Sequence, residues 1–172
     1  MAKIRMGFVT NSSSSSFIIA LDKLPTSVED VKKLLFKHGE TSYPALYSNE
    51  VFSIDEVADR VWQEFKDGKS KGDDYPFNVR EAMGGYWDDM PDFYNMYTKG
   101  LKFDPKEYRE ASNKARKDRE AWIDARYKEF KQAHPGKKIV ALEFSDNDGP
   151  LNASIEHGDL FNHLNAKRIS HH

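Results

Sequence analysis

The stretch KKIVALEF, residues 137–144, is a short run of apolar and β-branched residues that leads straight into a turn-forming segment, SDNDGP. Such a run is typical of a buried strand. Two N-terminal strands are predicted over residues 3–10 and 17–21, joined as a hairpin by the asparagine and serines between them. AKRIS, residues 166–170, predicts a last strand. We expect the strand at 139–144 to be central and to pair with the N-terminal strands.

Helical spacing and N-cap residues account for most of the chain between these strands. One helix is predicted after Thr26 or Ser27 and ends before Gly39, and a second begins after Ser53. Further helices are predicted around residues 78–83, 91–98, 105–134 and 159–164.

Strands at both ends with helices between them predict an α+β fold with a mixed or antiparallel sheet. The helix at about 105–134 is the long one, because Asp104 and Pro105 start it and Pro135 and Gly136 end it. Residues 1–172 are expected to form a single domain. Residues 67–104, rich in aromatic and acidic side chains, are expected to form an insertion that packs over the core as a lid.

Composition limits the classes of function. The chain has no cysteine, which excludes disulfides, thiolate metal sites and cysteine nucleophiles. We expect no signal peptide, and no apolar run reaches the roughly 18 residues of a membrane-spanning helix. The prediction is a cytoplasmic protein that does not bind membranes.

The charge distribution is uneven although the net charge is only −2. Residues 105–138 carry eleven basic and six acidic side chains. Because the two signs alternate along the predicted helix, this segment is more typical of a solvated face than of a nucleic-acid site. We expect no nucleic-acid partner, and the oligomeric state stays open.

A polar tract lies between the two predicted N-terminal strands: Asn11, Ser12, Ser13, Ser14, Ser15 and Ser16. Consecutive small polar residues let backbone N–H groups converge, and the hydroxyls add donors, so the tract predicts a binding loop for a phosphate or another anion. It lacks the glycines and the lysine of a P-loop, and the same residues are common in plain turns. Both interpretations stay open.

Carboxylates and histidines gather near the C-terminus. Asp146 and Asp148 follow the best strand, at a place where α/β enzymes often bind metals, although Asp148-Gly149 is also a turn signal. Glu156 and His157 are candidates for acid–base catalysis, but in an extended segment only one of them could face Asp146. His171 could reach the same end of the sheet. The candidate metal ligands are therefore Asp146 or Asp148 with His157 and His171, and a divalent metal is the candidate cofactor.

The two ends of the chain resemble those of small uncharacterised bacterial and phage proteins. The resemblance rests on the opening KIRMGFVTNSSSSSFII and on the late motifs FSDNDG, EHG and ISHH. It implies a phage or mobile-element setting. It also implies that His171 and His172 belong to the protein and that both ends serve one site, and it implies no catalytic role.

Two functions follow as hypotheses. The first is an accessory protein that binds a small anionic or phosphorylated ligand at the serine tract, or a partner protein on the long helix and the insertion. The second is a metal-dependent hydrolase or phosphodiesterase. In it Asp146, Asp148 and His171 hold the metal, and His157 and Glu156 act as acid and base.

Overall fold

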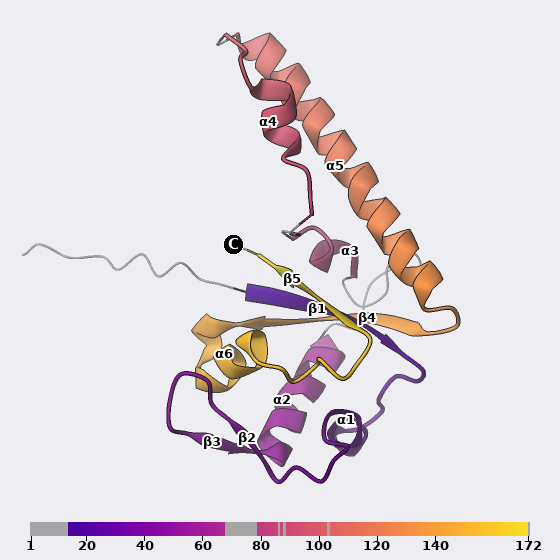
Figure 1. Cartoon of the computed structure of the whole chain (residues 1–172), viewed down its shortest axis with the longest axis vertical. Coiled ribbons are helices and arrows are strands. Elements are labelled where there is room, and N and C mark those ends of the chain that lie inside the picture. Colours follow the sequence, from indigo (N-terminus) through magenta and orange to yellow (C-terminus); the bar gives the residue numbers. More distant parts are fainter. Residues whose placement is uncertain (1–13, 68–78, 86, 88, 103, 172) are drawn as a thin grey trace, which may run out of the picture.

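The computed structural model describes residues 14–67, 79–85, 87, 89–102 and 104–171 of the chain. Its elements follow in the order β1 (Ser14–Leu21), α1 (Val28–Leu35), β2 (Ser42–Pro44), β3 (Val51–Ser53), α2 (Ile54–Asp67), α3 (Val79–Ala82), α4 (Phe93–Thr98), α5 (Pro105–Ala133), β4 (Lys138–Ser145), the 3₁₀ turn η1 (Asp146–Asp148), α6 (Pro150–His157) and β5 (Ala166–Ser170) (Figure 1). The predicted α+β class, with a sheet built from strands of both chain ends and one long helix, is confirmed.

The sheet has the strand order β4-β1-β5, and both pairings are antiparallel. Residues 17–21 pair with the strand at 139–144, as predicted, but β1 rather than β4 is central. The expected hairpin is also wrong for residues 15–19, because β4 and β5 occupy the two hydrogen-bonding edges of β1 there. The predicted strand over residues 3–10 lies outside the described residues.

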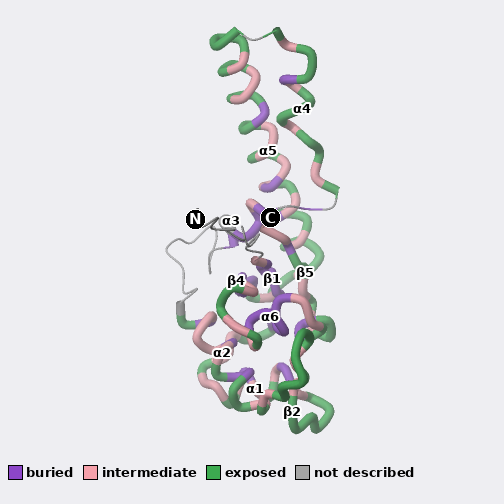
Figure 2. The backbone as a smooth tube through the Cα atoms, turned by 90° about the vertical axis from the view of Figure 1, so that its left-hand side faces the viewer, coloured by how far each residue is buried: buried purple, intermediate pink, exposed green. Residues whose placement is uncertain are grey.

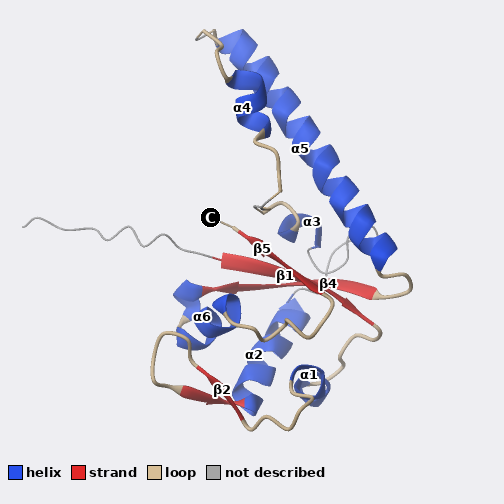
Figure 3. Ribbon diagram, in the orientation of Figure 1, coloured by secondary structure: helices blue, strands red, loops and turns tan. Residues whose placement is uncertain are grey.

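Helices cover both faces of this sheet (Figure 3). Alternation along β1 directs Phe17, Ile19 and Leu21 into one core, which contains apolar residues of α1, α2 and α6. Ile18 points into a second core, with residues of α3 and α5. β1 is buried throughout this stretch because helices lie on both sides of it.

Local capping explains where the first two helices begin. The Ser27 hydroxyl accepts a hydrogen bond from the N–H of Asp30, and Ser53 and Glu56 cap each other reciprocally at the start of α2. The predicted starts of these helices are therefore confirmed.

The insertion divides into two parts, and only one of them covers the core. Val79 and Met83, in and just after α3, are fully buried against the sheet. α4 packs instead along the N-terminal half of α5, which projects away from the sheet (Figure 1). There the Tyr97 hydroxyl donates a hydrogen bond to Asp118, and the Lys114 ammonium lies 4.5 Å from the Tyr97 ring centroid.

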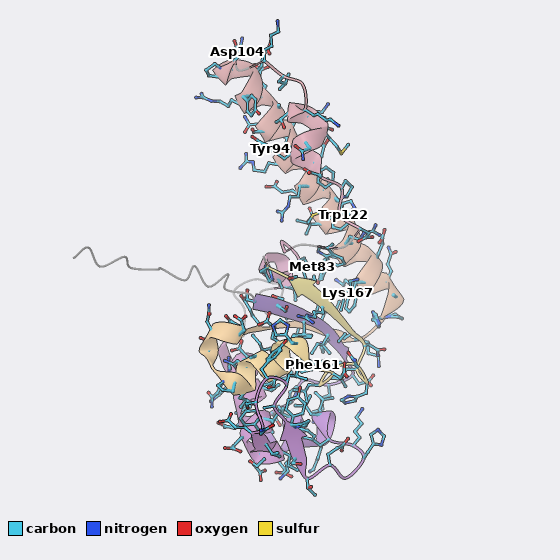
Figure 4. The ribbon with its side chains drawn as sticks, turned by 60° about the vertical axis from the view of Figure 1, so that its left-hand side comes forward. Met83, Tyr94, Asp104, Trp122, Phe161 and Lys167 are labelled. Carbon is cyan, nitrogen blue, oxygen red and sulfur yellow. The ribbon has the colours of Figure 1, made fainter. Side chains whose placement is uncertain are left out.

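The lid prediction is thus wrong for α4. Tyr94 and Asp104 lie on the arm formed by α4 and the first half of α5, far from Phe161 in the core on the other side of the sheet (Figure 4). Most of this arm is exposed or half-buried (Figure 2). The apolar stripe of α5 is sparse over this half, so the arm has little with which to cover the sheet.

The last predicted helix is displaced toward the N-terminus. Residues 159–164 form turns, and the helix is α6, which starts at Pro150 directly after Gly149. Gly149 has φ of +101°, a conformation that side chains rarely adopt, and Pro150 is suited to the first helical position. Among the described helices, none has the length and apolar character that crossing a membrane requires.

Candidate functional site

The two buried serines of β1 lie on opposite faces of the sheet. The Ser15 hydroxyl donates to Glu156 Oε1 of α6 at 3.2 Å, whereas the Ser16 hydroxyl lies 2.8 Å from His171 Nε2. Both serines are fully buried. Strand alternation alone separates them, so they do not belong to one pocket.

The predicted loop conformation is therefore wrong for Ser14, Ser15 and Ser16. These residues are the first of a paired strand, with Ser14 opposite Ser145, and their peptide groups contribute to the sheet. Asn11, Ser12 and Ser13 lie outside the described residues.

The helix carrying Glu156, α6, is held in place by hydrogen bonds from β2, from the loop after β2 and from α2. The Tyr43 hydroxyl donates to the Ser154 carbonyl at 2.8 Å, and the Leu46 N–H donates to the Ser154 hydroxyl at 3.1 Å. Arg60 Nε of α2 donates to Asn152 Oδ1 at 2.7 Å. These bonds fix α6, so its last turn presents Glu156 in a fully buried position.

Ionisation of Tyr43 should weaken the fold at high pH. Burial, with a smaller contribution from Asp159, raises the pKa of Tyr43 to about 12 from its ordinary value of 10.0. Above pH 10 the unfolded chain loses this proton while the folded chain keeps it, so stability falls as the pH rises from about 10 to 12. Chemical denaturation across this pH range measures the effect. A Tyr43→Phe variant should lack this part of the decline, and an unchanged pH profile in that variant would contradict the assignment.

Three side chains converge between the end of β4 and the end of α6. Asp146, Glu156 and His157 each offer one ligand atom, and these atoms all lie within 4.8 Å of one another. His157 Nε2 is 3.7 Å from Glu156 Oε2. The sequence-based expectation that only one of Glu156 and His157 could face Asp146 is wrong, because the two residues lie in a helical turn rather than in an extended segment.

Two predicted metal ligands lie outside this group. Asp148 is exposed, and it is not one of the three converging side chains. His171 continues β5 on the same face as Ile169, which belongs to the second core. The sheet therefore separates His171 from His157, and the predicted set of Asp146 or Asp148 with both histidines is not assembled.

Arg168 joins the group from β5. Its Nε donates to the Ser15 hydroxyl at 3.1 Å, and its Nη2 lies 3.2 Å from His157 Nδ1. Sequence reasoning missed this arginine. Only the pairing register between β5 and β1 indicates it: Arg168 lies opposite Phe17, so it shares a face of the sheet with Ser15.

Two carboxylates and an imidazole form a donor set that suits divalent cations such as Mn²⁺ and Zn²⁺. Glu156 is buried and Asp146 and His157 are half-buried, so the group lies at the margin of the core and is partly accessible to solvent. Such a position would let a held cation also contact a ligand from solvent.

Comparison with protein family models, with curated proteins and with solved structures found no match to this chain.

Proposed function

We propose that this protein binds an anionic ligand through a divalent cation held by Asp146, Glu156 and His157. The supporting observation is the convergence of their ligand atoms to within 4.8 Å at one place. These residues come from two elements on either side of Gly149: η1 directly follows β4, and α6 contacts both η1 and β4. A preformed arrangement of this kind lowers the entropic cost of ordering the ligands around a cation.

Burial supports a cation rather than a purely solvated acidic surface. Glu156 is fully buried, and a buried carboxylate requires compensating charge or hydrogen bonds. In the structure Ser15 and His157 lie against it, and Arg168 is connected to both. A bound cation would supply that compensation directly and would leave coordination positions for oxygen atoms of a ligand.

The test is calorimetric titration of the purified chain with Mn²⁺ and with Zn²⁺. Asp146→Asn should weaken cation binding by at least about 10-fold, since even residues that only support metal ligands typically cost that much. Asp148→Asn is the matched control, because it removes a nearby carboxylate outside the converging group. Equal affinities in these two variants and the wild-type chain would refute the site.

A second candidate function is hydrolysis of a phosphoester. The observation favouring it is the imidazole of His157 beside the carboxylate of Glu156, with Nε2 3.7 Å from Oε2. In this alternative the carboxylates of Asp146 and Glu156 would hold the cation, which would lower the pKa of a bound water, and His157 would be left to transfer protons instead of serving as a ligand. Release of p-nitrophenol from bis(p-nitrophenyl) phosphate in the presence of Mn²⁺, abolished by Asp146→Asn, would support an enzyme. No release would leave binding as the function.

The cellular setting is proposed on sequence grounds alone. The resemblance of both chain ends to small bacterial and phage proteins supports a phage or mobile-element origin, and the composition supports a cytoplasmic location. A partner protein on the arm of α4 and α5 remains the other form of a binding function. Exposed Tyr94 and Met96 on α4 would be available for it.

A further inference from the structure

We propose that Arg168 and the divalent cation compete for His157, and that the arginine displaced by the cation becomes a second contact for a phosphoryl ligand. This inference rests on the cation site proposed above. It adds an order of binding, in which the cation comes first, and it names the chemical class of the ligand.

The competition follows from the hydrogen bond between Arg168 Nη2 and His157 Nδ1, at 3.2 Å. A guanidinium can only donate, so Nδ1 must accept with its lone pair. In the neutral ring the proton then lies on Nε2, the nitrogen that faces Glu156. The one lone pair that this imidazole could offer to a metal is therefore already engaged by Arg168.

A cation bound to either ring nitrogen breaks that hydrogen bond. If it takes Nδ1, it replaces Arg168 directly. If it takes Nε2, the ring proton must move to Nδ1, which then presents a donor to another donor. Repulsion between the guanidinium and a divalent cation at this short range acts in the same direction.

In the structure, Arg168 supplies a positive charge near the buried carboxylate of Glu156. Its Nε donates to Ser15, whose hydroxyl donates to Glu156, so the guanidinium is connected to the buried carboxylate through one hydroxyl. A divalent cation beside Glu156 takes over this role. Arg168 is on the exposed side of the group, so it can swing outward without disturbing the core.

The displaced guanidinium favours a tetrahedral oxyanion. Its N–H donors form a planar fork that matches two oxygens of a phosphate, and a phosphate has further oxygens with which to contact the cation. A monocarboxylate has only two oxygens and cannot satisfy the fork and the cation equally well. The inferred ligand is therefore a phosphoryl group that bridges the cation and Arg168.

The test uses Mn²⁺ and inorganic phosphate with the full chain and two matched variants. Arg168→Met and Lys167→Met each remove one positive charge from adjacent positions of β5. Lys167 lies on the opposite face, with its ammonium 5.4 Å from the Trp87 ring centroid (Figure 4). Circular dichroism and thermal unfolding of each variant establish that the chain is folded before titration.

Arg168→Met should bind Mn²⁺ more tightly than the wild-type chain, by about 2- to 12-fold, the range that corresponds to one net hydrogen bond. Lys167→Met should bind it with unchanged affinity. In the wild-type chain and in Lys167→Met, saturating Mn²⁺ should raise phosphate affinity by at least about 5-fold, as is usual for coupled sites. Arg168→Met should lose most of this coupling, and acetate should show none in any chain.

The outcomes separate this inference from the proposed cation site. Mn²⁺ binding that is abolished by Asp146→Asn but is equal in Arg168→Met and wild type would overturn the competition and leave the cation site standing. Full Mn²⁺–phosphate coupling in Arg168→Met would overturn the phosphoryl contact. A wild-type chain that binds no Mn²⁺ would overturn both the cation site and the competition for it.

Discussion

Phe144→Ala should lower the free energy of unfolding by about 3 to 5 kcal/mol, the usual cost of removing a buried phenyl ring. Phe144 lies on β4 and is 1% exposed. Its ring centroid is 6.1 Å from that of Phe17 and 5.9 Å from that of Phe161, so it joins the sheet to the turns after α6. Because these two neighbours belong to different segments, β1 and the turns after α6, they cannot collapse together into the space that the ring leaves.

Urea denaturation followed by circular dichroism measures this loss. Glu143→Ala is the control, because Glu143 is the adjacent residue of β4 and is exposed. Its change in stability should stay within about 0.5 kcal/mol. A Phe144→Ala variant that loses less than about 1 kcal/mol would mean that this aromatic cluster is not closely packed.

Gly85→Ala should destabilise the chain by about 1 to 3 kcal/mol through overpacking. A Cβ at this position would lie 2.7 Å from each of three atoms: His171 Cε1, Ile169 Cγ2 and the Ser170 carbonyl oxygen. The carbonyl belongs to the backbone of β5 and cannot move independently of the sheet. The glycine therefore allows the segment after α3 to lie directly against the end of β5.

A double variant shows how much of this effect passes through His171. Removing the imidazole in Gly85→Ala/His171→Ala should relieve one of the three clashes, so the two changes should cost less together than the sum of their separate costs. Strict additivity would mean that the ring and the glycine do not touch. It would also contradict the position of His171 beside Ser16 at the end of the sheet.

Much of the secondary structure could be predicted from short-range signals. Ser27, Ser53 and Asp104 are N-caps whose side chains satisfy free N–H groups of their own helices, and this depends only on residues within one turn. The strands at 138–145 and 166–170 are short runs of suitable residues between turn signals. The α+β class followed from the order of these elements along the chain.

The candidate site was only partly predictable. Asp146 and His157 were predicted to belong to one ligand set, but the presence of Glu156 in the same group was not predicted, because it depends on where a helix begins. The sequence predicted this helix at residues 159–164, whereas the structure has it at Pro150–His157. Glu156 and His157 were therefore expected to lie in an extended segment and to point in opposite directions. Arg168 was missed because its position depends on the register between β5 and β1.

The amino-acid sequence alone determined the kind of each main element, the pairing of the two chain ends in one sheet and the residue types available for binding. The tertiary structure alone decided that β1 is central, that α4 lies on the projecting arm, and that Ser15 and Ser16 face opposite layers. The reason is physical. Capping and periodicity act within a few residues, whereas strand order and facing depend on which hydrogen-bonding edges and apolar surfaces are covered by segments more than a hundred residues away.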